Sequence, residues 1–173
     1  MTITNTIIKY NLEVFWDDEY KTLDYINEPF NDTINTDHWI SQGYPQRFTG
    51  DMADMQGRQP TWNQKFIDHF KKLGWKDVGT SYYKMSTGTC LPTHGDLYLK
   101  YIDLFKLQGQ EHTIRRAIVF LEDWKSGHYF EGIGIPLTQW SAGTVVEWTY
   151  DTPHMAANIG SEPRYTLQIT GHV

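Results

Sequence analysis

The sequence of 173 residues lacks the features of several large protein classes. Its only cysteine is Cys90, so an intrachain disulfide is impossible and a reducing compartment is the natural location. The first residues lack the basic start and apolar run of a signal peptide, and no stretch approaches the roughly 20 apolar residues that span a bilayer. We therefore expect a cytoplasmic protein with no membrane partner.

Basic residues are scarce as well. The formal net charge is −6, and Lys or Arg never occur in runs longer than two. A nucleic-acid-binding protein needs a dense positive surface, so this composition disfavours nucleic acid as a partner. Only the polar stretch 41–60, which carries Arg47 and Arg58, leaves room for a local basic groove.

No internal repeat or low-complexity linker divides the chain, so we expect a single domain over residues 1–173. Residues 1–77 are expected to be helical and loop support, and residues 78–173 a β-rich core. In the first part the sequence predicts a short helix over 17–28, a long loop over 41–60 and a helix over 62–73.

The helix over 62–73 has the clearest pattern. Thr61 and Gln64 have the spacing of a capping box, and Gly74 stands at the C-terminal capping position. Between them one apolar stripe recurs at helical spacing, which predicts a helix that packs on a sheet. The residues of the stripe are Trp62, Phe66, Ile67, Phe70 and Leu73.

From residue 78 onward, short runs rich in β-branched and aromatic residues are separated by Gly and Pro. In 113–121 the alternation places Ile118 and Phe120 on one face and Ala117 and Val119 on the other. The spacing of the runs favours a sandwich or barrel, so the fold class is mainly β with N-terminal helices (α+β). The expected strands are 79–86, 97–105, 113–121, 127–131, 144–149, 154–158 and 164–172.

Two histidines and an aspartate form the candidate metal site. His94 and Asp96 stand two residues apart, so on an extended chain their side chains point to the same side. His154, after Pro153, is the best third ligand from a distant segment. Two imidazoles and one carboxylate are the ligands of a facial triad, which binds Fe(II) and leaves positions open for a co-substrate and dioxygen.

Two further residues follow the second histidine. Arg164 stands ten residues after His154 and supplies a cation that can hold a carboxylate. Thr166 lies two residues further, on the same strand face. A His-x-Asp or a lone His is common in loops without a metal, so the order of all these motifs carries the hypothesis. The rival interpretation is a non-catalytic, cupin-like metal-binding or structural protein, although the His-x-His spacing of cupin metal sites is absent.

In this order the motifs resemble those of the 2-oxoglutarate- and Fe(II)-dependent dioxygenase superfamily, and most closely its prolyl-4-hydroxylase-like branch. The resemblance covers roughly residues 79–172. That branch commonly has Lys where this chain has Arg164. The segments that carry the resemblance are SYYKMSTGTCLPTHGD, RRAIVFLEDWKSGHYFEG and WSAGTVVEWTYDTPHMAANIGSEPRYTLQITG.

The resemblance implies a double-stranded β-helix core, the jelly-roll fold that cupins share. It implies that His94, Asp96 and His154 bind Fe(II), and that 2-oxoglutarate is bound by Arg164, Thr166 and Tyr83. The implied reaction consumes O2, releases succinate and CO2, and hydroxylates an amino-acid or protein side chain, with ascorbate as a supporting reductant. Small-molecule and peptide or protein substrates are both compatible with it, and the oligomeric state stays open. Oxidative demethylation of nucleic acid is less favoured because of the acidic charge.

The sequence also predicts the surroundings of four other residues from their positions in the expected strands and loops. Arg116 shares a strand face with Ile118 and Phe120, so it either points inward or forms a salt bridge at the sheet end. His128 is expected at a pocket rim, where it can touch substrate. Cys90 is expected to be a small buried hydrophobic residue. His172 is expected to fray at the chain end.

Overall fold

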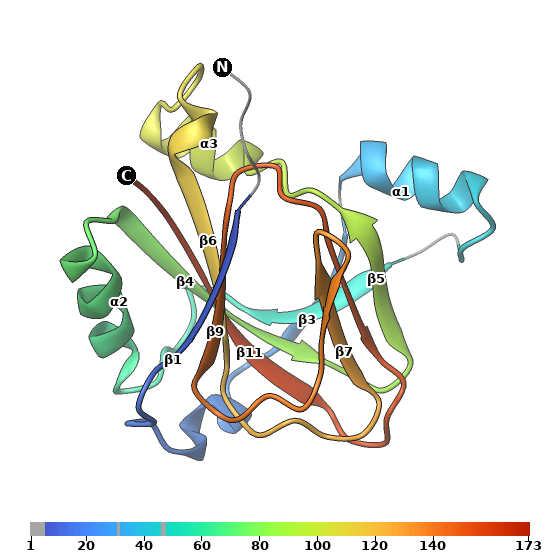
Figure 1. Ribbon diagram of the computed structural model, residues 1–173, viewed down its shortest axis with the longest axis horizontal. Helices are drawn as coiled ribbons and strands as arrows, with labels where there is room; N and C mark the ends of the chain where they lie inside the picture. Colours follow the sequence, from blue (N-terminus) through green and yellow to red (C-terminus); the bar gives the residue numbers. More distant parts are fainter. Residues whose placement is uncertain (1–5, 31, 46–47) are drawn as a thin grey trace.

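The computed structural model describes residues 6–30, 32–45 and 48–173, and it consists mainly of two antiparallel sheets (Figure 1). The strand order is β1-β9-β6-β11-β4-β3-β2 in the large sheet and β5-β10-β7-β8 in the small one. The strands are β1 Ile7–Asn11, β2 Ile26–Pro29, β3 Thr49–Ala53, β4 Lys76–Met85, β5 Thr89–His94, β6 Ile114–Phe120, β7 His128–Gly132, β8 Ile135–Leu137, β9 Thr144–Thr149, β10 His154–Asn158 and β11 Arg164–His172. The helices are η1 Asp18–Thr22, α1 Thr33–Ser41, α2 Asn63–Lys72, α3 Leu99–Phe105 and η2 Glu111–Thr113.

The two sheets face each other and enclose one hydrophobic layer, as in a jelly roll. Chain neighbours such as β9 and β10 belong to different sheets, so the chain crosses between the sheets repeatedly. The core is therefore the expected double-stranded β-helix, and the predicted fold class is confirmed. The predicted strands at 144–149, 154–158 and 164–172 have the observed bounds of β9, β10 and β11.

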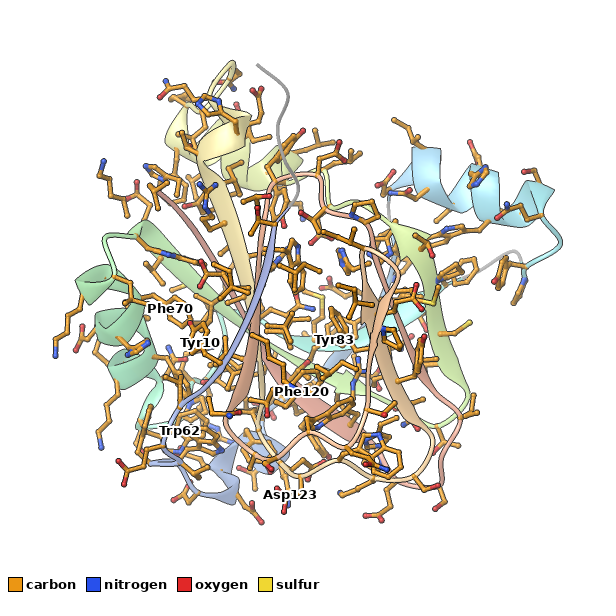
Figure 2. The ribbon with its side chains drawn as sticks, viewed as in Figure 1. Tyr10, Trp62, Phe70, Tyr83, Phe120 and Asp123 are labelled. Atoms are coloured by element: carbon orange, nitrogen blue, oxygen red, sulfur yellow. The ribbon has the colours of Figure 1, made fainter. Side chains whose placement is uncertain are left out.

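The large sheet has a hydrophobic layer on each face, and the alternation in β6 shows how. Ala117 and Val119 pack on the side of α2, whereas Ile118 and Phe120 point toward the small sheet. Figure 2 shows Phe120 near the middle of the molecule and Phe70 on the α2 side. The predicted assignment of the two faces is confirmed, and the apolar run from Ala117 to Phe120 fits a strand segment that is buried on both faces.

α2 covers the outer face of the large sheet (Figure 1). Phe66 and Phe70 are fully buried there, and Trp62 packs beside them. Gly74 has φ +91°, a left-handed conformation that costs glycine little and ends the helix. The stripe that predicted this helix is therefore its buried face.

The predicted capping box before α2 is wrong. The helix begins after Trp62, whose side chain makes no capping hydrogen bond. The Thr61 hydroxyl and backbone N–H instead donate to the Glu19 carboxylate, at 2.9 Å each. A tertiary contact to the η1 region has replaced the local one, because the Thr61 hydroxyl donates to a charged carboxylate instead of accepting from an N–H of the helix end.

The predicted helix over 17–28 is only partly present. Asp17 caps the start by accepting from the Glu19 N–H, but the helical turn ends at Thr22. The chain then extends and pairs as β2 with β3, where Ile26 lies opposite Met52. The local pattern favours a longer helix, but the end of this segment forms a strand because it pairs with β3, which is distant in sequence.

The predicted strand over 97–105 is wrong, because this segment forms α3. Tyr98, Ile102 and Leu107 are buried together, and Tyr101 and Phe105 pack against them, which is helical spacing. The apolar residues of this segment also fit a period of two, which is why the sequence predicted a strand.

The N-terminal part of the chain contributes more β-structure than expected. The stretch 41–60, predicted as a loop, contains β3, and the preceding residues form α1, which Asp32 caps. β1, β2 and β3 extend both edges of the large sheet. The part up to residue 77 is thus built into the sheet and is more than helical and loop support.

The α-helices of the described residues are short. They contain nine, ten and seven residues in α1, α2 and α3. None of the helices in this part of the chain has the length and apolar character that a membrane crossing requires.

Replacement of Phe66 with Ala should destabilise the protein strongly, because the side chain is fully buried between α2 and the large sheet. We expect a loss of about 3–5 kcal/mol in the free energy of unfolding, measured by urea denaturation. Lys72→Ala, an exposed position on the same helix, is the control and should change stability by less than about 0.5 kcal/mol. Equal effects of the two substitutions would contradict the assignment of the buried face.

Candidate metal centre

His94, Asp96 and His154 come together at one end of the two-sheet core. His94 is the last residue of β5, His154 is the first residue of β10, and the two strands pair so that these residues lie opposite each other. Asp96 follows in the segment that leads to α3. Strand pairing therefore joins a motif and a histidine that are far apart in sequence.

The three side chains are close enough to share one ion. The Nε2 atoms of His94 and His154 lie 3.8 and 3.9 Å from the Asp96 carboxylate oxygens, and one ligand atom from each residue fits within 4.8 Å. Both imidazoles are more than 90% buried, and their ring centroids are 4.4 Å apart. Ligand atoms that are bound at about 2 Å to one ion lie about 3 Å apart when adjacent, so a small inward movement of the three side chains lets them share an ion.

The orientation of both histidines is set by the backbone. The Nδ1 atoms of His94 and His154 lie 2.7 and 3.0 Å from the carbonyl oxygens of Pro92 and Thr152. These contacts assign the hydrogen to Nδ1 in each ring and leave the Nε2 lone pair toward Asp96. Metal-binding histidines are generally held by such a hydrogen bond from the other ring nitrogen.

The protonation states also suit a metal. Burial opposes the charged carboxylate, but Arg116 and the two histidines lower the pKa of Asp96 to about 2. Burial lowers the pKa of His154 to about 4, and the nearby Asp96 only partly opposes this shift. At neutral pH the site therefore offers an anionic carboxylate and a neutral imidazole, the forms in which these groups bind metals. The residues fit a divalent transition metal.

Arg164, Thr166 and Tyr83 lie in the same cavity as the three ligand candidates. This cavity has a volume of about 560 Å³ and lies between the two sheets. Thr166 pairs with Tyr83 across β11 and β4, so both side chains are on the inner face. The structure thus brings together all six predicted site residues.

Arg164 is a buried cation without a carboxylate partner in the described part of the chain. Its exposure is 3%; Nη1 donates to the Tyr129 carbonyl at 2.8 Å, and Nε has no partner among the described residues. Burial lowers the pKa of Arg164 to about 10, and Tyr83 partly opposes this shift. A buried cation of this kind is costly unless an anion compensates it, so the residue fits an anionic ligand.

Tyr83 depends on a glycine in the neighbouring strand. A Cβ at Gly50 of β3 would overlap the Tyr83 hydroxyl, so only glycine leaves room for this side chain. Burial raises the pKa of Tyr83 to about 12, although Arg164 acts in the opposite direction. The hydroxyl therefore stays protonated at neutral pH and can donate a hydrogen bond into the cavity.

Several residues outside this group lie elsewhere than expected. His128 is 2% exposed and its Nε2–H donates to the Glu162 carbonyl at 3.0 Å, so it is a structural residue and does not stand at a rim. His172 lies in β11 and contacts Tyr101 and Asp77, so it is not frayed. Cys90 is half-buried in β5.

The two arginines of the expected loop give no sign of a basic groove. Arg58 contacts the Glu19 carboxylate at 3.5 Å and also donates to Thr22. Arg47 lies outside the described residues. In the described part of this region, the Arg58 side chain is therefore engaged in contacts within the protein and forms no basic groove.

Arg116 was expected either to point inward or to form a salt bridge, and in the structure it does both. The side chain points inward on β6, and its Nη2 lies 3.3 Å from Asp96 Oδ2. The shared face with Ile118 and Phe120 was the signal for the inward direction. The ion pair itself needed the position of Asp96, which the strand alternation does not supply.

The fold and the site define a double-stranded β-helix protein with a His-Asp-His cluster in a cavity between its sheets. An oxidoreductase of the 2OG-Fe(II) oxygenase family from Burkholderia pseudomallei has a similar structure, with a TM-score of 0.58 and 10% identity over 96% of this chain and 84% of that one. A prolyl-4-hydroxylase from Pseudomonas putida is similar with a TM-score of 0.55 and 14% identity, over 90% of this chain and 95% of that one.

Some cupin structures also share the fold. One is the cupin domain of Cnp3 from Schizosaccharomyces pombe, with a TM-score of 0.43 and 10% identity over 87% of this chain and 85% of that one. No protein-family model and no curated protein sequence matches the chain. At these identities the two oxygenase structures support the fold alone.

Replacement of Asp96 with Asn or His154 with Ala should abolish tight metal binding, because each removes one of three converging ligand atoms. Outer-shell residues typically contribute about 10–100-fold to metal affinity, so we expect a weakening of at least about 100-fold for either ligand. Anaerobic titration with Mn(II) or Co(II), followed by calorimetry, measures the change. The exposed His38→Ala is the control; wild-type affinity in the two site variants would refute the metal site.

His128 should make stability depend on pH. Burial lowers its pKa below the ordinary 6.5, and Lys125 and Arg164 add to this effect while the Glu162 carbonyl and Glu122 oppose it. Below pH 6.5 the unfolded chain therefore binds more protons than the folded one, and stability falls as pH falls.

We expect the melting temperature of the wild-type protein to drop more between pH 7.5 and pH 5 than that of His128→Gln. The glutamine keeps an N–H donor for the Glu162 carbonyl but cannot take up a proton. His112→Gln, at an exposed position, should follow the wild-type curve. Parallel curves for wild type and His128→Gln would contradict the burial argument.

Proposed function

We propose that this protein is an Fe(II)- and 2-oxoglutarate-dependent dioxygenase that hydroxylates an amino-acid or protein side chain. The observation that carries the proposal is the buried Arg164 in the same cavity as the His-Asp-His cluster. A protein that only binds a metal has no need of a buried cation without a carboxylate partner. A dicarboxylate that binds the metal at one end and Arg164 at the other accounts for both.

The metal would be held by His94, Asp96 and His154. When bound, Fe(II) supplies the activation of O2 that couples the oxidative decarboxylation of 2-oxoglutarate, to succinate and CO2, to hydroxylation of a substrate C–H bond. Three protein ligands leave positions for small molecules on the other face of the ion.

The chain itself binds and orients the co-substrate. The Arg164 guanidinium can make two parallel hydrogen bonds to the distal carboxylate, a geometry that its planar fork favours. The hydroxyls of Thr166 and Tyr83 are further donors on the same inner face, and the raised pKa of Tyr83 keeps its proton in place.

The walls of the cavity exclude water from the site. Phe130 and Trp148 line the cavity, are each 2% exposed and lie between the sheets. An apolar surrounding strengthens the electrostatic contacts of Arg164 and keeps reactive species from water. The volume of about 560 Å³ is within the range of small-molecule sites, so a co-substrate and a substrate group can be held together.

The prime substrate belongs to the same proposal. Prolyl-hydroxylase-like activity on a small molecule or on a peptide or protein side chain is the form we favour, with ascorbate as a supporting reductant. The net charge of −6 and the engaged Arg58 do not favour nucleic acid as a substrate.

Purified protein with Fe(II), 2-oxoglutarate, ascorbate and air should form succinate even without its prime substrate. Arg164→Met should raise the KM for 2-oxoglutarate by about 100-fold, because roughly 3 kcal/mol of charge-assisted hydrogen bonding is lost. Succinate formation in air, measured against the 2-oxoglutarate concentration, gives the activity and the KM. Calorimetry under anaerobic conditions gives the affinity for 2-oxoglutarate without turnover.

Two matched variants control this experiment. Arg164→Lys keeps the cation and should recover part of the affinity. Arg115→Met removes a cation from a residue of β6 that donates to the backbone carbonyls of His112 and Ile114 and is not among the cavity residues, and it should behave as wild type. Metal binding without any 2-oxoglutarate binding would refute the dioxygenase and favour the cupin-like alternative.

A further inference from the structure

The inner face of β11 carries more polar side chains than the binding of 2-oxoglutarate would use. Alternate residues of the strand line the cavity, whereas Tyr165, Leu167 and Ile169 between them pack in the apolar layer beside α2. The cavity-lining residues of β11 are Arg164, Thr166, Gln168 and Thr170. The Cα atoms of Arg164 and Gln168 are about 13 Å apart along the strand, which is more than a five-carbon dicarboxylate spans. The second half of this polar row therefore has no role in the proposed co-substrate site.

Gln168 has an unused amino group. Arg116 Nη1 donates to Gln168 Oε1 at 3.3 Å. A guanidinium can only donate hydrogen bonds, so this contact identifies the oxygen end of the carboxamide. The Nε2 amino group at the other end carries two N–H donors, and neither has a partner among the described residues. Gln168 is half-buried and lines the cavity, so these donors are available to a ligand there.

Two hydroxyls lie beside Gln168 on the same inner face. Ser81 of β4 is its cross-strand partner, and Thr170 is the next residue of β11 that lines the cavity. Both residues are half-buried, and neither hydroxyl is hydrogen-bonded within residues 6–30, 32–45 and 48–173. Three neighbouring side chains thus offer hydrogen bonds that the described part of the protein does not use.

This group of donors lies next to the metal cluster. Arg116 contacts Gln168 Oε1 and Asp96 Oδ2, each at 3.3 Å. Only one side chain therefore separates Gln168 from a residue of the His-Asp-His cluster. A small molecule that is held by Gln168 has its neighbouring C–H bonds close to the position of the metal, as a reacting group requires.

The charges of the cavity favour an anion in this place. A divalent metal and a bound dicarboxylate cancel each other, and histidines that bind a metal are neutral. Asp96 compensates one of the two arginines that line the cavity, so one positive charge remains. The other charged lining residues do not remove it, because Glu28 and Lys100 are exposed and opposite in charge and Asp32 is engaged as the cap of α1. An uncompensated charge away from water favours a ligand of opposite charge.

We propose that Gln168, Ser81 and Thr170 form a subsite for the carboxylate of a free amino acid, which is the substrate. The inference rests on the proposed dioxygenase function and narrows its substrate class. A carboxylate accepts hydrogen bonds from all three side chains and supplies the missing negative charge. An amino acid within a polypeptide has an uncharged amide at this point, whose N–H would face a group of donors.

The experiment measures binding without turnover. Protein that is loaded with Mn(II) and saturated with 2-oxoglutarate under argon is titrated by calorimetry with each standard free L-amino acid, its carboxamide and its N-acetyl derivative. We expect at least one free amino acid to bind, and its carboxamide to bind about 10–100-fold more weakly, which corresponds to one charge-assisted hydrogen bond. The N-acetyl derivative represents the C-terminal residue of a peptide and should bind more weakly than the free amino acid.

Gln168→Glu tests the role of the amino group. The new carboxylate still accepts from Arg116, but it repels a substrate carboxylate and accepts from the N–H of a carboxamide. The free amino acid should bind at least about 10-fold more weakly than to wild type, and the carboxamide more tightly. Gln108→Glu adds the same charge at an exposed position outside the cavity and should leave both affinities unchanged. A purely structural role of Gln168 would weaken both ligands alike.

Three results would overturn the proposal: no binding of any free amino acid, equal affinities for the acid and its carboxamide, or equal losses of both ligands in Gln168→Glu. An N-acetyl derivative that binds as tightly as the free amino acid would instead identify a peptide C-terminus as the source of the carboxylate and overturn the free amino acid. If the Mn(II) protein does not bind 2-oxoglutarate, the dioxygenase function fails. The same titrations without 2-oxoglutarate then still decide the subsite.

A folding defect in Gln168→Glu would be detected by its melting temperature. In that case Ser81→Ala is the test variant, because it removes a hydroxyl from the subsite without removing the Gln168 contact to Arg116. It should weaken the free amino acid about 10-fold and the carboxamide less. An unchanged affinity for the free amino acid in Ser81→Ala would then overturn the proposal.

Discussion

The antiparallel pairing of β10 with β5 is the constraint on which the candidate metal centre depends. It sets His154 opposite His94 and points both rings into the space between the sheets. Because side chains alternate along a strand, a shift of one residue in this register would turn one histidine away. In each case the ring is then fixed by the carbonyl two residues earlier in the chain, at Pro92 and Thr152. The same local arrangement thus occurs on two paired strands.

The cavity holds two arginines with different electrostatic environments. Arg116 is paired with Asp96, whose pKa it helps to lower, so its charge is compensated within the protein. Arg164 has only neutral partners among the described residues, and burial lowers its pKa. A charge that the protein compensates shapes the site, whereas one that it leaves uncompensated attracts a ligand. This difference supports the anion-binding role proposed for Arg164.

The N-terminal part of the chain also shapes the site. β3 lies beside β4 in the large sheet, and the missing side chain of Gly50 makes room for the Tyr83 hydroxyl. On the other face of the same sheet, α2 covers Tyr82, whose hydroxyl donates to Asn63 at 2.6 Å. Adjacent tyrosines in β4 therefore have separate tasks, one in packing and one in the cavity.

The sequence alone determined the elements with strong local patterns. The stripe of α2, the alternation in β6 and the bounds of β9, β10 and β11 could all be read from it, because burial on a sheet or helix face imposes a period on the residues. It also contained the order of His94, Asp96, His154 and Arg164, and hence the hypothesis of a metal site with an anion-binding cation. Each of these features depends on neighbours in the chain or on a motif.

Only the tertiary structure decided the remaining features. The segment of α3 fits both a strand and a helix, and burial of Tyr98 beside Ile102 selected the helix. β2 formed where a helix was expected, because pairing with β3 outweighed the local pattern. The ion pair of Arg116 with Asp96 joins β6 to the segment between β5 and α3, and these are adjacent only in the folded protein. Such contacts depend on distances between remote segments, which no period in a sequence encodes.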